Sequence, residues 1–340
     1  MEVNLPELQV VRVKGVKEVA VRAVAKEIFL KAGTRGSKLA LAQTDWVITK
    51  LLSFYPDLKI EKVIIKTKGD KILDSPLSKI GGKGLFVKEI EEALIKGEVD
   101  FAVHSMKDVP SEIPEELEIF CIPERESPFD VWISRYQTIF DLPEGAKVGT
   151  SSLRRISQIR KIRKDLEILP LRGNVDTRLK KWERGDFDGI ILAEAGLKRL
   201  GIRVSYYRFS VAEMVPAVGQ GALGIEIRKN DQELKKLFKK LHSEETAICI
   251  KAERAFLHRV EGGCQVPLGA YACIKENKLF FVAFISDVSG ERFYKVVEED
   301  NPKNAEILGI KTAEKLLKMG GKEILEEIYS RENIPETGVS

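Results

Sequence analysis

The chain has 340 residues, of which 44% are hydrophobic and 32% are charged, and its net charge is +4. This length allows two or three domains, and the composition excludes a wholly disordered chain. The near balance of charge disfavours a general nucleic-acid binder, and no apolar stretch approaches the roughly 18 residues of a membrane span.

Residues 1–26 alternate valine with charged residues and lack the continuous apolar region of a secretory signal. We expect this segment to be an extension that packs on the surface. Three of the four cysteines, Cys121, Cys249 and Cys273, lie in apolar runs and are predicted to be buried free thiols. None of the four forms a C-x-x-C pair and only three histidines occur, so no metal site is expected. The sequence therefore predicts a cytoplasmic protein.

The first third of the chain alternates strands with helices, and basic or glycine-rich turns join them. Strands are predicted at 28–32, 59–67 and 99–104, and helices at 38–54 and 86–95. The middle third repeats this pattern, with strands at 147–149, 167–171, 187–193 and 225–227 and helices opening near 153, 178 and 194. Such alternation is typical of a mostly parallel sheet with helices on both faces.

The last third has a different order of elements. A helix at 246–260 precedes strands at 270–274, 279–285 and 292–297, and a helix at 304–319 follows. This order indicates an α+β unit with an antiparallel sheet. We predict two α/β domains around a cleft and a smaller C-terminal domain, with crossings between the first two near 121–129 and 215–224. The predicted ranges are 27–123 with 222–240, then 124–221, then 241–330, with a tail at 331–340.

Basic and hydroxyl side chains follow four of the predicted strands. In an open α/β sheet, ligands bind beyond the carboxyl ends of the strands, and arginine holds carboxylates through paired hydrogen bonds. Each such residue alone is more often a solvated charge or a helix cap, but their repetition at four strand ends favours a site for a ligand with many carboxylates. The residues are Arg35, Ser37, Ser105, Lys107, Thr150, Ser151, Ser152, Arg154, Arg155, Arg172 and Arg178.

Two other residues differ from this basic set. Asp108 is an acid beside Lys107 in a turn that Pro110 stiffens. It either pairs with a neighbouring group or faces a developing cation and passes protons. Cys264 follows two glycines and precedes a proline, so the sequence places it in a loop and not in a core. A covalent role for this sulfur beside an anionic ligand is the leading hypothesis.

Several long motifs, in order, resemble those of the porphobilinogen deaminase (hydroxymethylbilane synthase) family. The resemblance covers about 28–329 and rests on GTRGS at 33–37, GGKGLF at 81–86, HSMKDVP at 104–110, GTSSLRR at 149–155, LRGNV at 171–175, VGQGA at 218–222 and EGGCQVP at 261–267. It implies two domains like those of periplasmic binding proteins plus a third, in a monomer. It also implies a dipyrromethane cofactor joined to Cys264 by a thioether.

The activity implied is the head-to-tail addition of four porphobilinogen molecules to this primer, with release of ammonia and then, by hydrolysis, of 1-hydroxymethylbilane. Asp108 and Lys107 would be catalytic, and Asp108 would stabilise the azafulvene-type cation that loss of ammonia leaves. Arg35, Arg172, Arg178 and a stacked Phe86 would bind substrate. The cofactor would be held by Cys264 together with Arg35, Ser37, Ser105, Lys107, Asp108, Thr150, Ser151, Ser152, Arg154, Arg155, Arg172, Arg178 and Gln220.

Two rival functions come from other classes. A non-catalytic polyanion-binding module of the two-domain receptor type would share the fold, although the lack of an export signal and a reactive Cys264, as the loop context predicts, count against it. A cysteine hydrolase would need a histidine near Cys264, and His258 falls on a predicted helix. Asp176 departs from the family pattern, because it places an acid beside the Arg172–Arg178 turn.

Overall fold

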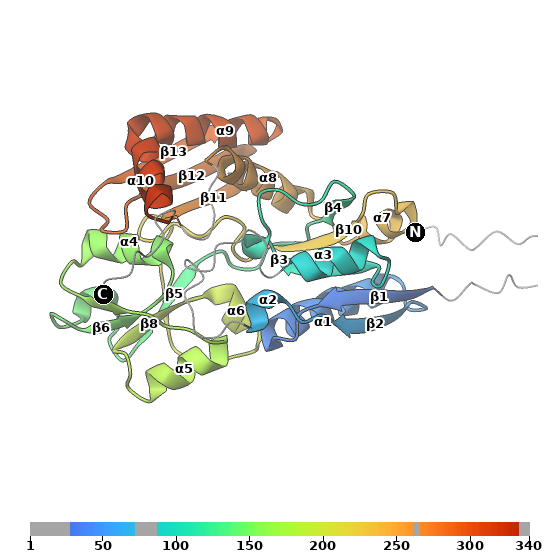
Figure 1. Ribbon diagram of the computed structural model, residues 1–340, viewed down its shortest axis with the longest axis horizontal. Helices are drawn as coiled ribbons and strands as arrows, with labels where there is room; N and C mark the ends of the chain where they lie inside the picture. The colour runs from blue at the N-terminus through green and yellow to red at the C-terminus, as the bar shows by residue number, and fades with distance from the viewer. Residues whose placement is uncertain (1–27, 72–86, 261–265, 333–340) are drawn as a thin grey trace, which may run out of the picture.

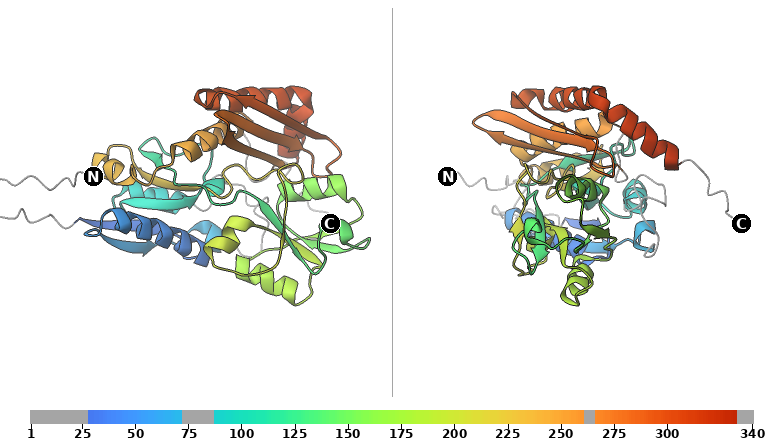
Figure 2. Two further views of the ribbon diagram at one scale, coloured as in Figure 1. Left: turned by 180° about the vertical axis from the view of Figure 1, so that it is seen from behind. Right: turned by 90° about the vertical axis from the view of Figure 1, so that its left-hand side faces the viewer.

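The computed structural model describes residues 28–71, 87–260 and 266–332 of the chain. Its strands form two five-stranded mixed sheets and one three-stranded antiparallel sheet. We call the first two sheets with their helices lobe 1 and lobe 2, and the third sheet with its helices the C-terminal domain. Figure 1 shows the lobes side by side with the C-terminal domain covering both, and Figure 2 confirms this arrangement from two further directions.

Lobe 1 holds its sheet between two helix layers. The sheet has the order β2-β1-β3-β10-β4, and α1 and α7 pack on one face while α3 packs on the other. The strands are β1 (Phe29–Thr34), β2 (Lys59–Ile64), β3 (Phe101–Ser105), β4 (Leu117–Cys121) and β10 (Leu223–Arg228). The helices are α1 (Lys38–Phe54), α2 (Lys68–Lys71), α3 (Lys88–Ile95) and α7 (Gln232–Phe238).

Lobe 2 repeats this plan with a shorter sheet. The order is β7-β6-β8-β5-β9, and helices cover both faces. The strands are β5 (Asp130–Ser134), β6 (Lys147–Gly149), β7 (Glu167–Leu169), β8 (Gly189–Ala193) and β9 (Tyr207–Arg208). The helices are α4 (Leu153–Ile162), α5 (Val175–Glu183) and α6 (Glu194–Arg199). Within each sheet one strand, β10 or β5, runs antiparallel to both of its neighbours, so the prediction of mostly parallel sheets holds for the remaining strands.

The C-terminal domain has a sheet of order β11-β12-β13. Helices α8 and α9 pack on one face and build its core, while Val282 and Phe284 on the other face pack against Val215. The strands are β11 (Leu268–Lys275), β12 (Lys278–Ser286) and β13 (Phe293–Asp300), and the helices are α8 (Glu244–Arg259), α9 (Ala305–Leu316) and α10 (Lys322–Glu332). The predicted fold class of two α/β units and a smaller α+β unit is therefore confirmed.

Some predicted boundaries were wrong, and a few elements were not foreseen. The strand expected at 59–67 ends at Ile64, and the helix expected to begin at 86 begins at Lys88. The sequence reading did not foresee β4, β5, β9, α7 or α10. Strand β5 opens with a charged residue, Asp130, which interrupted the apolar pattern by which strands were recognised.

The chain passes between the two lobe sheets twice, after β4 and again before β10. One buried carboxylate, that of Glu253 on α8, holds both passages. It accepts hydrogen bonds from Arg125 in the first passage, at 2.6 and 3.2 Å, and from the Gly219 amide in the second, at 2.7 Å. It also accepts one from the Ala272 amide of β11, at 2.9 Å. Glu253 therefore ties both passages to the C-terminal domain.

Lobe 1 contains a buried acid whose charge state should affect stability. Glu91 on α3 lies near the buried pair of His104 on β3 and Glu226 on β10, whose Nε2 and Oε2 atoms are 2.9 Å apart. Burial and then the charge of Glu226 raise the pKa of Glu91 from 4.5 to about 7, although His104 and Lys88 oppose them. The folded protein therefore binds an additional proton between these pH values.

We expect the protein to become less stable as pH rises from 5 to 8, because the folded state then loses the proton of Glu91. Because the folded-state pKa is raised, the stabilisation is present below about pH 4.5 and is lost through pH 7. Relative to Glu91→Gln, the wild-type free energy of unfolding should fall by up to about 3 kcal/mol, at about 1.4 kcal/mol per pKa unit. Urea unfolding across this pH range measures the difference. The exposed Glu92→Gln variant serves as control, and a pH-independent difference for Glu91→Gln would contradict the prediction.

Candidate active site between the lobes

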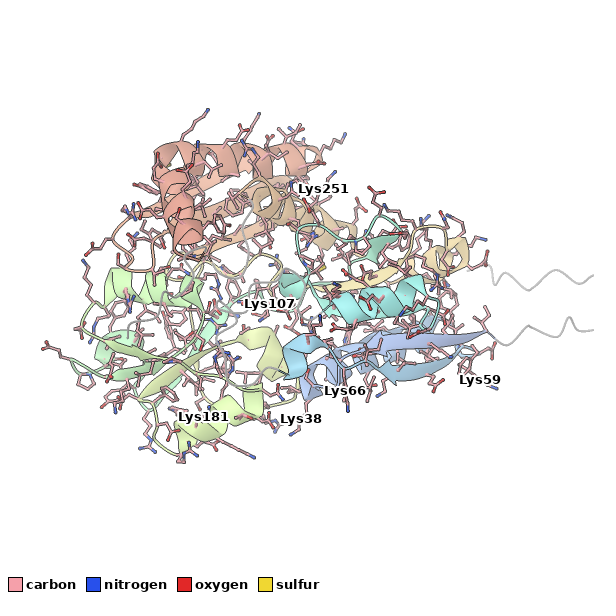
Figure 3. The ribbon with its side chains drawn as sticks, viewed as in Figure 1. Lys38, Lys59, Lys66, Lys107, Lys181 and Lys251 are labelled. Carbon is pink, nitrogen blue, oxygen red and sulfur yellow. The ribbon has the colours of Figure 1, made fainter. Side chains whose placement is uncertain are left out.

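The turn after β3 carries Lys107 and Asp108 at the junction of the two lobes (Figure 3). Residues Met106–Asp108 form a single 3-10 turn, and the Met106 amide donates to the Ala222 carbonyl at 3.0 Å. Gly219 has a φ of 72°, and a Cβ there would lie only 2.8 Å from Met106 Cβ and 3.1 Å from the Lys107 nitrogen. Glycine is therefore required at 219, because the second passage between the lobes runs directly against this turn.

Lys107 lies among charges from the opposite lobe. Burial lowers the pKa of Lys107, and Arg155 and Arg154 lower it further, while Asp108 and Asp130 act in the opposite direction. Asp108 and Lys107 are both partly buried. The Lys107 ammonium thus belongs to lobe 1 but lies close enough to the guanidinium groups of α4 in lobe 2 for their charges to lower its pKa.

Asp130, the first residue of β5, pairs with both arginines that open α4. Its fully buried carboxylate accepts hydrogen bonds from Arg154 at 2.7 and 3.2 Å and from Arg155 at 2.7 and 2.9 Å. Burial alone would raise the pKa of Asp130, but the charges and hydrogen bonds of the two arginines outweigh it and hold that pKa well below its usual range. The sequence reading assigned Arg154 and Arg155 but missed Asp130. An acid at the start of the apolar run Val131–Ile133 was the available signal, since a charge beside a buried strand needs a partner.

Arg178 and Arg172 extend the cationic group along lobe 2. The turn before α5 is tight, because Gly173 adopts a φ of 106° and its carbonyl accepts from Arg178 Nε at 2.7 Å. Burial lowers the pKa of Arg178 to about 10, and the like charges of Arg155 and Arg172 contribute. Two basic turns predicted separately from the sequence, after β6 and after β7, therefore come together in space.

The predicted hydroxyl and amide side chains have structural hydrogen bonds of their own. Ser37 caps α1 through the Ala40 amide at 3.2 Å, and Ser152 caps α4 through the Arg155 amide at 3.4 Å. The other bonds join Thr150 to the Ser152 amide at 3.2 Å, Ser151 to the Leu171 carbonyl at 3.1 Å, Ser105 to Gln43 at 2.8 Å and Gln220 to the Pro128 carbonyl at 2.7 Å. These bonds fix the turns that present the charged residues. That the same groups contact a ligand stays a prediction.

Asp176 pairs across the lobes and not with the arginines beside it. Its Oδ2 lies 2.8 Å from Lys38 Nζ, at the first residue of α1. Lys38 lowers the pKa of Asp176, so this carboxylate is charged and engaged. Arg35 precedes Lys38 by three residues, is partly buried and follows β1. The extra acid therefore joins the Arg35 turn of lobe 1 to the Arg172–Arg178 turn of lobe 2.

Two predicted site residues, Cys264 and Phe86, lie outside the described residues, as does the glycine-rich motif at 81–84. The three described cysteines are free thiols. Burial raises the pKa of Cys121 and of Cys249 to about 12. Because the thiolate is the nucleophile, neither of these two thiols is suited to forming a covalent bond at neutral pH.

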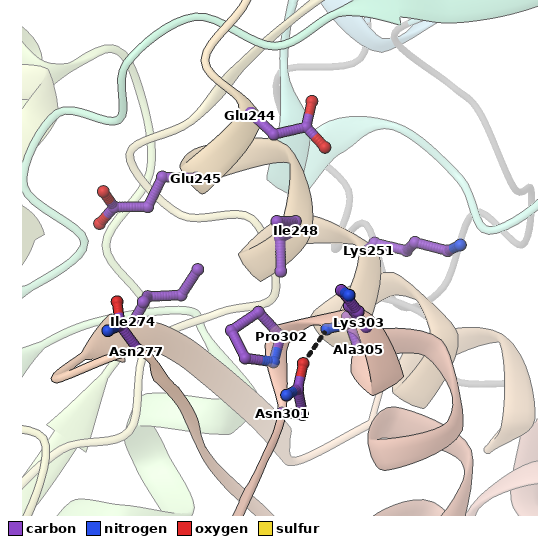
Figure 4. A pocket seen from close by; sticks show the side chains of 10 residues that line it. All are labelled: Glu244, Glu245, Ile248, Lys251, Ile274, Asn277, Asn301, Pro302, Lys303 and Ala305. Atoms are coloured by element: carbon purple, nitrogen blue, oxygen red, sulfur yellow. Dashed lines mark hydrogen bonds between the residues drawn. The ribbon is translucent and has the colours of Figure 1, made fainter.

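Within the described residues, no group of three or more His, Cys, Asp or Glu side chains is placed to hold a metal ion. No helix among them is long and apolar enough to cross a membrane. An open hollow of about 710 Å³ lies on the C-terminal domain (Figure 4). It combines Glu244 and Glu245 with Lys251, which pairs with Glu306 at 2.9 Å. It therefore lacks the excess of buried positive charge that lies between the lobes.

The chain matches two family models, described as "Porphobilinogen deaminase, dipyromethane cofactor binding domain" over 30–236 and "Porphobilinogen deaminase, C-terminal domain" over 247–318. It is 51% identical over 304 residues to a porphobilinogen deaminase of Geobacter sulfurreducens, covering 89% of this chain and 96% of the relative. Identity to the one of Syntrophobacter fumaroxidans is 50% over 303 residues, covering 88% and 98%.

Among solved structures, a probable amino-acid ABC transporter extracellular-binding protein of Bacillus subtilis covers 64% of this chain and 90% of its own. Its TM-score is 0.38 at 14% identity. The two family models and the relatives at about 50% identity set aside both rival functions. The chain belongs to the porphobilinogen deaminase family and forms hydroxymethylbilane from porphobilinogen on a dipyrromethane cofactor.

Proposed function

We propose that the cationic residues between the lobes hold the dipyrromethane cofactor and the growing pyrrole chain through their carboxylates. Each pyrrole unit carries an acetate and a propionate, so every addition brings two negative charges. The observation that supports this is that burial lowers the pKa values of Lys107, Arg155 and Arg178, and that a neighbouring arginine lowers each of them further. Buried cations are costly unless anions compensate them, and a ligand of many carboxylates would supply the compensation.

The donor set fits this ligand better than it fits a simple phosphate. The guanidinium groups of Arg155, Arg172 and Arg178 come from two different turns, so they can serve several separate carboxylates. The Lys107 ammonium of lobe 1 is close enough to Arg155 for that charge to lower its pKa. Arg35, at the end of β1, would serve the entering porphobilinogen together with Arg172 and Arg178. The hydroxyls of Ser37, Thr150, Ser151 and Ser152 and the side chains of Ser105 and Gln220 would add hydrogen bonds at the ligand's edge.

Asp108 would act on the reacting pyrrole. When bound, the cofactor would supply the nucleophilic pyrrole carbon to which porphobilinogen is joined. The Asp108 carboxylate, held on the turn after β3, would stabilise positive charge that develops on the substrate as ammonia leaves. It would also accept a pyrrole proton afterwards. Lys107, adjacent in the same turn, would hold ligand carboxylate and supply a proton to a leaving amine.

Cys264 would carry the cofactor through a thioether, and Phe86 would stack over the bound substrate. Cys264 follows the end of α8 by five positions in sequence, so the tether would start beside the C-terminal domain. A thioether resists hydrolysis, which suits a permanent primer and not a turned-over intermediate. We also propose a cytoplasmic monomer, in keeping with the three free thiols of the described residues.

The test of this proposal is the intact mass of the purified protein. We expect a covalent increase equal to two pyrrole units over the polypeptide mass, and stepwise increases when porphobilinogen is added. An active preparation that has the mass of the bare polypeptide would exclude a tethered cofactor. A protein that carries the increase but does not consume porphobilinogen would instead exclude the proposed turnover.

A further inference from the structure

The two arginines that open α4 do not offer all of their N–H groups to a ligand. A guanidinium has five N–H donors. Arg154 donates from Nη1 to Asp130 and to the Val215 carbonyl at 2.8 Å, and from Nη2 to Asp130 and to Gln220 Oε1 at 3.4 Å. Only its Nε–H remains without a partner within the described part of the chain.

Arg155 keeps more of its donors. It donates from Nε and Nη2 to Asp130 Oδ1, and from Nη1 to the Ile191 carbonyl at 2.8 Å. One N–H on each terminal nitrogen has no partner in the regions that the structure covers. Two such donors are the number that a carboxylate takes from one guanidinium in a paired contact. The pair of arginines thus presents three N–H groups, two of them on one side chain.

Asp130 determines which donors are left. Its Oδ1 atom takes the Nε and Nη2 donors of Arg155 and one donor of Arg154, while Oδ2 takes another from Arg154. The carboxylate is fully buried at the start of β5, in the sheet of lobe 2, and so has little freedom to move. It also compensates one of the two positive charges, so that the pair retains a net charge for an anion.

We propose that Asp130 is a positioning residue of the active site, which orients the Arg154–Arg155 pair so that the free donors of Arg155 meet a carboxylate of the cofactor or growing chain. This rests on the proposed function, because it assigns Asp130 a role in binding that same ligand. Asp130 itself does not touch the ligand, because its oxygens are already engaged by the two arginines.

The experiment compares Asp130→Asn with wild type in three readouts: the fraction of folded protein that carries the two-pyrrole mass, the KM for porphobilinogen, and kcat. We expect the asparagine variant to lose at least nine tenths of the adduct, or to raise KM at least tenfold with a smaller change in kcat. A merely structural aspartate would lower the unfolding temperature and leave adduct fraction and KM as in wild type, and that result would overturn the proposal.

Asp130→Glu keeps the charge but moves the carboxylate by one methylene, and it decides the question if Asp130→Asn does not fold. It should retain more adduct than the asparagine variant, yet show a KM raised several-fold; a wild-type KM would count against positioning.

Asp165→Asn is the matched control. It removes an aspartate that pairs with Arg163 at 2.6 and 2.8 Å beyond the far end of α4, and it should leave adduct and KM unchanged. Wild-type protein without adduct would overturn the proposed function instead, whatever the variants do.

Discussion

Replacing Cys264 with alanine is expected to give a folded protein that carries no pyrrole adduct and forms no detectable hydroxymethylbilane. The physical reason lies in the other thiols. Burial raises the pKa of Cys121 and Cys249 to about 12, so each stays protonated at neutral pH. Without the sulfur at 264 neither of them can replace it as the point of attachment. Intact mass spectrometry and a porphobilinogen consumption assay measure the two losses.

The matched control for this prediction is Cys273→Ala. Cys273 is a free, partly buried thiol on β11 of the same C-terminal domain. Its loss should leave the two-pyrrole mass and the rate of turnover close to wild type. An adduct that persists in Cys264→Ala would place the attachment point at another residue. Its loss in Cys273→Ala as well would then identify Cys273 as that residue.

Replacing Asp108 with alanine is expected to lower kcat by roughly 10²- to 10⁴-fold while the protein still carries its adduct or an arrested longer chain. The carboxylate lies beside Lys107, in a region where the guanidinium groups of α4 supply positive charge. Removing the acid leaves nothing in that turn to stabilise positive charge on the substrate. The ligand-binding cations remain in place, so binding should suffer less than turnover. Single-turnover kinetics together with intact mass separate the two effects.

Two further variants make this result specific to position 108. Asp108→Glu retains the charge and should recover part of the lost rate. Glu112→Gln removes an exposed acid four residues along the chain, which lies 3.7 Å from His258, and should behave as wild type. Near-normal turnover in Asp108→Ala would remove this residue from the mechanism.

Much of this arrangement was predictable from the sequence, because it depends on local order. The alternation of strands, basic turns and helices predicted two α/β lobes, and the changed order after residue 240 predicted a separate α+β domain. Arg155 was identified as a site residue because it follows a predicted strand at the start of a helix, and Arg178 because it flanks the turn after another strand; they lie in the first turns of α4 and α5. Position after the carboxyl end of a strand is a local property, so the sequence could predict it.

The partners of these residues could not be predicted in the same way. Asp130 precedes Arg154 by 24 positions, and Glu253 follows Arg125 by 128. No sequence pattern joins such pairs, because they meet only when separate strands and helices pack. The ion pair of Lys38 and Asp176 spans 138 positions and two lobes. The sequence showed Asp176 only as an unexplained acid.

The carboxylate of Glu253 has a mechanical consequence. It accepts hydrogen bonds from both chain passages between the lobes and from an amide of β11 at once, so one side chain of α8 holds these three segments together. Cys264 lies in the sequence between Glu253 and Ala272, and these two residues are joined by a hydrogen bond of 2.9 Å. If Cys264 carries the primer as proposed, the described chain on both sides of the attachment point is anchored at this one carboxylate, whichever pyrrole unit is being added.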